Sequence, residues 1–120
     1  MTGNLSTLTL TVAAAAALEA NRFVTQAGAY PAAGGAAFGV TRTSAAAAGD
    51  LVPVDVQGTA IVESGAAVTL DAPLMVDATG RVVPLSGAGK SPVARAMQAA
   101  TGAGQPIEVL LVPSAGLVTA

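Results

Sequence analysis

The sequence predicts a mainly β protein, a small β-barrel or β-sandwich of about eight short strands with an extended N-terminal arm and at most one short helix. Apolar and polar residues alternate in several short runs, and turn residues recur about every 8–12 residues along the chain. No fixed repeat period is visible, which argues against a solenoid. At 120 residues, one domain is expected. We divide the chain into an N-terminal arm, residues 1–15, and a single β domain, residues 16–120.

The first expected strand, from Ser6 to Val12, has the clearest alternation. Its threonines lie on one face and its apolar residues on the other: Thr7, Thr9 and Thr11 against Leu8, Leu10 and Val12. This run could equally be an arm that pairs with another chain. The alanines that follow, Ala13 to Ala17, allow either a turn of helix or an extended connector.

The remaining expected strands are bounded by glycine, proline or Ala-rich turns. They cover residues 22–25, 37–41, 51–57, 59–63, 74–76, 81–83, 93–100 and 107–112. Pro53 indicates an edge position or a bulge for its strand, because proline cannot donate to a ladder. A hairpin is expected around Asp77–Gly80, where Gly80 supplies the positive φ of the turn.

Residues 93–100 leave two readings open. Ala, Arg, Met and Gln favour a helix, but the side chains also alternate as they would in a strand. We favour the strand, because Pro92 and Gly102 bracket the segment closely.

The composition argues against catalysis. The chain has no histidine, so a Ser-His-Asp triad is impossible, and no cysteine to act as a thiolate nucleophile or soft metal ligand. We expect no enzyme activity, no catalytic, cofactor-binding or metal-binding residues, no cofactor and no small-molecule ligand.

Charge and hydropathy exclude two further classes of partner. The net charge is −2, and the five cations are spread along the chain without forming a basic stripe: Arg22, Arg42, Arg81, Lys90 and Arg95. Nucleic-acid binding is therefore not expected. No apolar run approaches the ~20 residues of a membrane span, and a soluble protein made in the cytoplasm is expected.

Two motifs have a simple structural interpretation. Ser86–Ser91 resembles the end of a phosphate-binding loop, but Pro84 occupies the first glycine position and Pro92 follows at once, so we expect a solvated loop. Four aspartates are expected to stabilise turns through side-chain-to-backbone hydrogen bonds: Asp50, Asp55, Asp71 and Asp77.

The three aromatic residues are too few for a stacking platform. Core packing is expected for Phe23 and Phe38. Tyr30, which lies beside Pro31 in an expected loop, is a candidate interface residue.

The order of segments from about Leu18 to Val112 resembles the capsid cement, or head decoration, proteins of tailed phages. The resembling pieces are Ala37–Arg42, Ala48–Val54, Gly58–Val62, Pro73–Pro84, Pro92–Ala96 and Gly104–Leu111, in that order and spacing. The resemblance implies a mainly β fold, a homo-oligomer that is often a trimer, and a place on the outer surface of the virion. It implies the major capsid protein as partner and offers no catalytic residues.

Physical arguments lead to a specific mechanism for such a protein. A low-charge β domain can trimerise through apolar faces, while the arm from Thr2 to Val12 adds a strand to a capsid subunit. Deleting residues 2–12 is then expected to abolish capsid binding and leave the trimer folded. The alternative is another β-rich phage or bacterial assembly module, such as a tail or surface protein.

Overall fold

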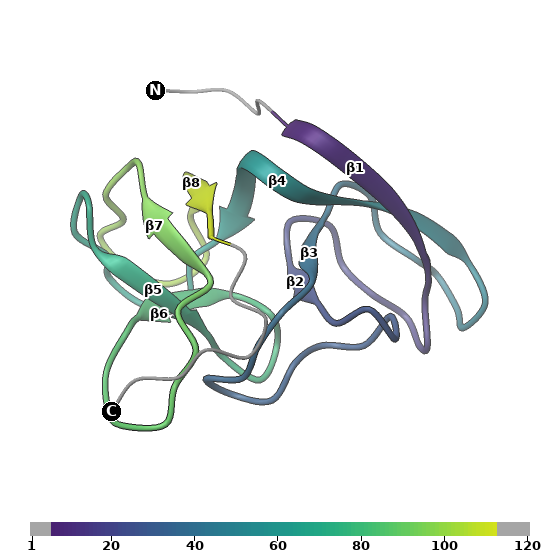
Figure 1. Cartoon of the computed structure of the whole chain (residues 1–120), viewed down its shortest axis with the longest axis horizontal. Coiled ribbons are helices and arrows are strands. Elements are labelled where there is room, and N and C mark those ends of the chain that lie inside the picture. Colours follow the sequence, from purple (N-terminus) through teal and green to yellow (C-terminus); the bar gives the residue numbers. More distant parts are fainter. Residues whose placement is uncertain (1–5, 113–120) are drawn as a thin grey trace.

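The computed structural model describes residues 6–112, with side chains from residue 8 onward. Eight strands form one curled antiparallel sheet, a half-barrel in which the order is β2-β3-β4-β8-β7-β5-β6 and β1 pairs with β4 (Figure 1). The strands are β1 (Ser6–Ala13), β2 (Phe23–Val24), β3 (Gly39–Thr41), β4 (Leu51–Glu63), β5 (Pro73–Val76), β6 (Val82–Pro84), β7 (Ala94–Ala96) and β8 (Pro106–Leu111). The predicted mainly β fold is confirmed.

Strand β4 connects the two halves of the molecule. Its first part, residues 51–58, pairs with β1, and its second part, residues 59–63, pairs with β8. The change of partner occurs at Gly58, where a φ of +97° bends the strand. Glycine adopts this conformation without steric cost. The two strands expected here are therefore one long bent strand, which links the β1 side to the β5–β8 side (Figure 1).

Pro53 was expected to mark an edge position or a bulge. The edge position is wrong, because β4 is an interior strand with β1 on one side and β3 on the other, and the register shifts of the β1–β4 ladder lie between Ser6 and Thr9, away from the Thr11–Pro53 pair. The ladder tolerates this proline because β3 ends at Thr41, which pairs with Val54. No residue of β3 therefore requires an N–H donor from Pro53.

Residues 6–13 of the expected arm form β1, which pairs antiparallel with β4 of the same chain. Val12 lies opposite Val52 and is buried, so the end of β1 belongs to the core. Residues 1–5 of the expected arm lie outside the described residues. Beyond β1, the chain continues to Ala17 in extended and bent conformations without helix. Of the two alternatives for Ala13–Ala17, the extended connector is therefore confirmed and the turn of helix is wrong.

Two hydrophobic clusters stabilise the sheet. The larger one is built from β5, β6, β7, β8 and the second part of β4, and it includes Phe23 and Val40. The smaller one contains Val12, Ala14, Leu18, Val24, Ala45, Val52 and Val54. Because Phe23 belongs to one cluster and its neighbour Val24 to the other, the short strand β2 lies where the clusters meet.

The predicted hairpin and the strand within residues 93–100 are confirmed. Strands β5 and β6 pair through the turn at Asp77–Gly80, and Gly80 has a φ of +80°. Asp77 Oδ1 accepts hydrogen bonds from the backbone N–H groups of Thr79 and Arg81. In residues 93–100 only Ala94–Ala96 form a strand, and bends and an isolated bridge at Ala100 follow.

Candidate assembly surfaces

The segment that resembles a phosphate-binding loop leads into a strand and not into a helix. Ser91 is buried, and its backbone N–H donates to the carbonyl of Gly34 over 2.9 Å. Pro92 and Val93 follow, and β7 begins at Ala94. A phosphate-binding loop needs the N-terminus of a helix at this point. This geometry therefore does not form the anion cradle of such a loop.

Within residues 6–112 there is no group of three or more Asp or Glu side chains placed to hold a metal ion. The same part of the chain contains no helix long and apolar enough to cross a membrane. Three surface features of the described residues are available for contact: an apolar strand edge, a network of ion pairs and a polar groove.

The apolar strand edge is β1. Leu8 and Leu10 are 43% and 40% exposed. Leu10 lies opposite the buried Val54, so it shares the face of β1 that continues into the smaller cluster. Strand β1 contains no charged residue and no proline, the two devices that commonly prevent an edge from pairing with another chain. It is therefore an apolar edge suited to contact.

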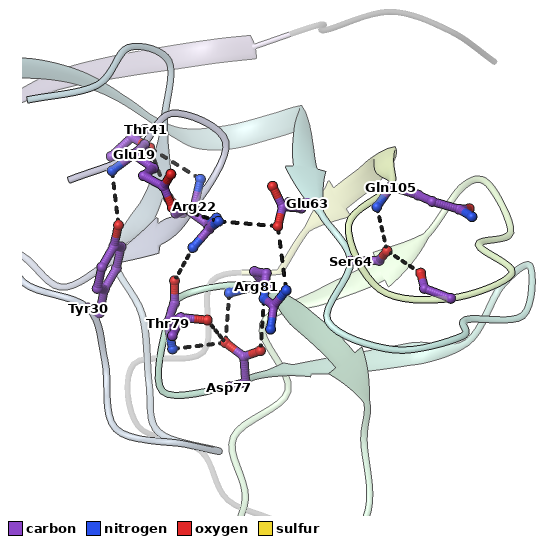
Figure 2. Close-up of polar contacts among 11 residues, drawn as sticks. Glu19, Arg22, Tyr30, Thr41, Glu63, Ser64, Asp77, Thr79, Arg81 and Gln105 are labelled. Carbon is purple, nitrogen blue, oxygen red and sulfur yellow. Dashed lines mark hydrogen bonds and ion pairs between the residues drawn. The ribbon is translucent and has the colours of Figure 1, made fainter.

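A network of ion pairs lies beside the junction of the two hydrophobic clusters, and Figure 2 shows its members pointing toward one another. Arg22 is buried, and its Nη2 lies 2.8 Å from Glu19 Oε2 and 3.2 Å from Glu63 Oε2. Its Nη1 donates to the carbonyl of Thr79 over 3.1 Å. Arg81 Nη1 lies 3.6 Å from the same oxygen of Glu63. The network thus connects the β5–β6 turn to β4 and to the residues before β2.

Asp77 completes this network at the β5–β6 turn. Partial burial alone would raise the pKa of its carboxyl. Hydrogen bonds from Thr79 Oγ1 and from the backbone of Thr79 and Arg81, together with the charge of Arg81, outweigh burial and hold the pKa below 3.8. Asp77 is therefore ionised at neutral pH and is stabilised in that form by folding.

The polar groove lies across β1, β4 and the residues after β3, and it has a volume of about 780 Å³. Its base is Asp55, which is 1% exposed. Arg42 Nε donates to both oxygens of this carboxylate, over 2.8 and 3.0 Å. Thr9 Oγ1 donates to Asp55 Oδ1 over 2.8 Å. Since a buried carboxylate requires such partners, the pair fixes the position of the Arg42 guanidinium at the surface.

The turn-stabilising hydrogen bonds expected of the four aspartates are confirmed for Asp50 and Asp77. Asp50 Oδ2 accepts from the backbone N–H groups of Ala46 and Ala47, and Asp77 Oδ1 accepts from those of Thr79 and Arg81. Asp71 lies in a turn, as expected, with a φ of +70°. The turn role is wrong for Asp55, which lies within β4 as the buried partner of Arg42. The alternating pattern of residues 51–57 was the available signal, because it places Asp55 inside a strand.

The aromatic residues serve the interior. Phe23 is a buried member of the larger cluster, as expected, and Phe38 packs partly buried against the smaller one. Tyr30 packs against the smaller cluster, and its hydroxyl accepts a hydrogen bond from the backbone N–H of Glu19 over 2.9 Å. Tyr30 therefore has an intramolecular role, which Figure 2 shows.

Together, these features define a β-sheet protein with an exposed apolar strand, a network of ion pairs and a polar groove. The sequence profile of the phage cement protein family matches residues 2–111, so the chain belongs to this family and is a structural protein of a phage particle. No curated protein matches the sequence.

Among solved structures, the fold is similar to that of the N base of the head fiber gp8.5 of bacteriophage phi29. The TM-score is 0.70 and the sequence identity 19%, and the match covers 89% of this chain and 95% of the phi29 chain. At this identity, the likeness concerns the fold.

Proposed function

We propose that this protein is a capsid cement protein that binds the outside of a phage head as a homo-oligomer, a trimer, and stabilises the major capsid subunits. It is made in the host cytoplasm and is placed on the outer surface of the virion. Membership of the phage cement protein family supports this proposal. The apolar strand β1 and the polar groove at Arg42 also support it, because both are suited to contact with other chains.

The observation that carries the proposal is the apolar edge of β1. Within residues 6–112, β4 is the strand that pairs with β1, and Leu8 and Leu10 are partly exposed beside that ladder. A segment of a capsid subunit can extend the sheet here through backbone hydrogen bonds, and the two leucines add apolar contact. This role keeps β1 in its own sheet and uses it as a template for the neighbour.

The trimer supplies avidity. Each contact made by one copy is small, but copies held together engage several capsid subunits at once, so the weak contacts are multiplied. Exposed apolar side chains on other strands, Leu51 and Leu110, are available for contacts between copies.

The test measures the mass in solution and co-sedimentation with empty heads. The unaltered protein is expected to be trimeric and to sediment with heads. The double substitution Leu8→Ser/Leu10→Ser is expected to weaken head binding about tenfold to fiftyfold. Burying the exposed two-fifths of each leucine is worth roughly 0.6–1.2 kcal/mol, or about 1.2–2.4 kcal/mol for the two. Leu70→Ser is the matched control, because Leu70 is 64% exposed in a turn away from β1.

Two results would contradict the proposal. A monomer that stays in the supernatant would favour the alternative, a tail or surface assembly module. Equal head binding by the double variant and by Leu70→Ser would remove β1 from the mechanism.

A further inference from the structure

We propose that the groove around Arg42 is a receptor for a single carboxylate side chain, an Asp or Glu of the capsid subunit on which the protein sits. This inference rests on the proposed function and names the chemistry of one contact. It concerns a surface separate from the leucines of β1, although Thr9 of the same strand lines the groove.

The first argument is the state of the Arg42 guanidinium. Its Nε donates to Asp55, whereas no acceptor among the side chains of residues 8–112 or their backbone meets its Nη1 or Nη2. The side chain is 42% exposed, so these two groups are open to a partner. A guanidinium presents five donors in a rigid fork, and its terminal amines match the two oxygens of a carboxylate.

The second argument comes from Arg22 in the same chain. Arg22 lies between two carboxylates, Glu19 at 2.8 Å and Glu63 at 3.2 Å. Arg42 has one carboxylate of such a set, Asp55. The chain therefore already contains a guanidinium held by two carboxylates, one of which, Glu63, it shares with Arg81.

The third argument is the excess of donors on the groove wall. Asn21 and Thr43 line it, and neither side chain bonds to another described residue. The backbone of Asn21 is held by hydrogen bonds to Thr41 and Glu63 in a left-handed conformation, with a φ of +61°. Such backbone conformations persist where the surroundings enforce them, and they frequently mark functional positions. An incoming acceptor group would satisfy these donors.

The charge of the groove selects a carboxylate over a polyanion. Arg42 is the single cation on its wall, and Asp55 already balances it. A phosphate chain requires several cations along its path. One carboxylate with a local hydrogen-bond set matches what the groove offers, as in the Arg22 network.

The main test is head binding by Arg42→Gln/Asp55→Asn. The two amides keep the shape and the hydrogen bond of the pair, and the net charge of the protein is unchanged. We expect binding to fall about tenfold to a hundredfold, the worth of a charge-assisted hydrogen bond, and to depend less on salt. Arg95→Gln is the control, because Arg95 is an exposed cation on β7 outside the groove. It should bind normally.

A cross-linking test identifies the partner. Lys90 is the only lysine of the chain. In Arg42→Lys/Asp55→Asn/Lys90→Arg, position 42 therefore carries the only side-chain amine. Carbodiimide treatment of decorated heads should join this amine to an Asp or Glu of the capsid protein as an amide, located by peptide mass mapping. Lys90→Arg alone should give no cross-link from position 42.

Failure of this inference is distinct from failure of the proposed function. If the unaltered protein does not bind heads, both are overturned. If it binds heads, and Arg42→Gln/Asp55→Asn binds equally well while folded by circular dichroism, the receptor role of Arg42 alone is overturned. A cross-link to a neighbouring copy in place of the capsid protein would overturn the assigned partner.

Discussion

Arg22 Nη2 lies 3.2 Å from Glu63 Oε2, and this ion pair joins residues 41 positions apart at the meeting point of the two hydrophobic clusters. Phe23 and Val24, which follow Arg22 directly, belong to different clusters. A backbone hydrogen bond from Glu63 N–H to the Asn21 carbonyl, 3.0 Å long, reinforces the same junction. The half-barrel is therefore held together at its centre by polar contacts between two apolar regions.

The first prediction is that Arg22→Ala lowers the free energy of unfolding by about 2–3 kcal/mol. Removing one member of a fully buried pair costs about 3–5 kcal/mol. Here the loss is smaller, because Glu63 is 30% exposed and Glu19 71%, so water can solvate them. Urea denaturation measures the change. Arg95→Ala should remain within about 0.5 kcal/mol of the unaltered protein, and equal losses in both variants would contradict the role of the network.

The second prediction concerns pH and Asp77. Because its pKa in the folded protein lies below 3.8, its stabilising contribution is present above that pH and is lost as the pH falls through the folded-state pKa. Asp77→Asn is expected to lower stability by about 1 kcal/mol at pH 7 and by progressively less below pH 3.8. Thermal unfolding at pH 7, 5 and 3 measures this difference.

The matched control for Asp77 is Asp71→Asn. Asp71 is exposed in a turn, and asparagine tolerates its positive φ equally well. This variant should unfold like the unaltered protein at each pH. A loss for Asp77→Asn that stays constant down to pH 3 would show that the charge of Asp77 does not contribute.

The third prediction tests the close approach of β3 to β4. A methyl group at Gly39 would meet the carbonyl oxygen of Asp55 and the side chains of Val54 and Val56. Gly39→Ala is expected to destabilise the protein by about 1–3 kcal/mol, the cost of overpacking. Gly102→Ala is the control, because open space surrounds Gly102. The two variants are compared by urea denaturation, and similar midpoints would refute tight packing at Gly39.

Local patterns predicted the strands well, because alternation and turn residues act within a few positions. The hairpin at Asp77–Gly80 and the first strand are examples, and their boundaries agree with the structure to within about two residues. The resemblance carried by the order of segments also led to the correct family.

Contacts between distant residues were not predictable in this way. The pairs Arg22–Glu63 and Arg42–Asp55 depend on how β4 bends at Gly58 and where β3 ends, and neither leaves a signal in local alternation. Likewise, the alternation of Ser6–Val12 suits a strand of the same sheet and an arm equally. The pairing of Val12 with Val52 shows that the segment is a strand of its own sheet. This pairing depends on the position of β4, which local alternation does not encode.

The last prediction concerns the deletion of residues 2–12, for which the structure motivates a different expected outcome from the one drawn from the sequence. Deleting residues 2–12 would remove β1 and with it Val12, which is 6% exposed in the smaller cluster. We therefore expect this deletion to expose Val52 and Val54 and to unfold the protein, so it cannot isolate head binding. Val12→Ala should cost about 2 kcal/mol, from two methyl groups at ~0.8 kcal/mol each and a small cavity. Thr11→Ala, at an exposed position of the same strand, should cost less than about 0.5 kcal/mol. Circular dichroism and urea denaturation measure all three variants, and a folded deletion variant would show that β1 is dispensable for the fold.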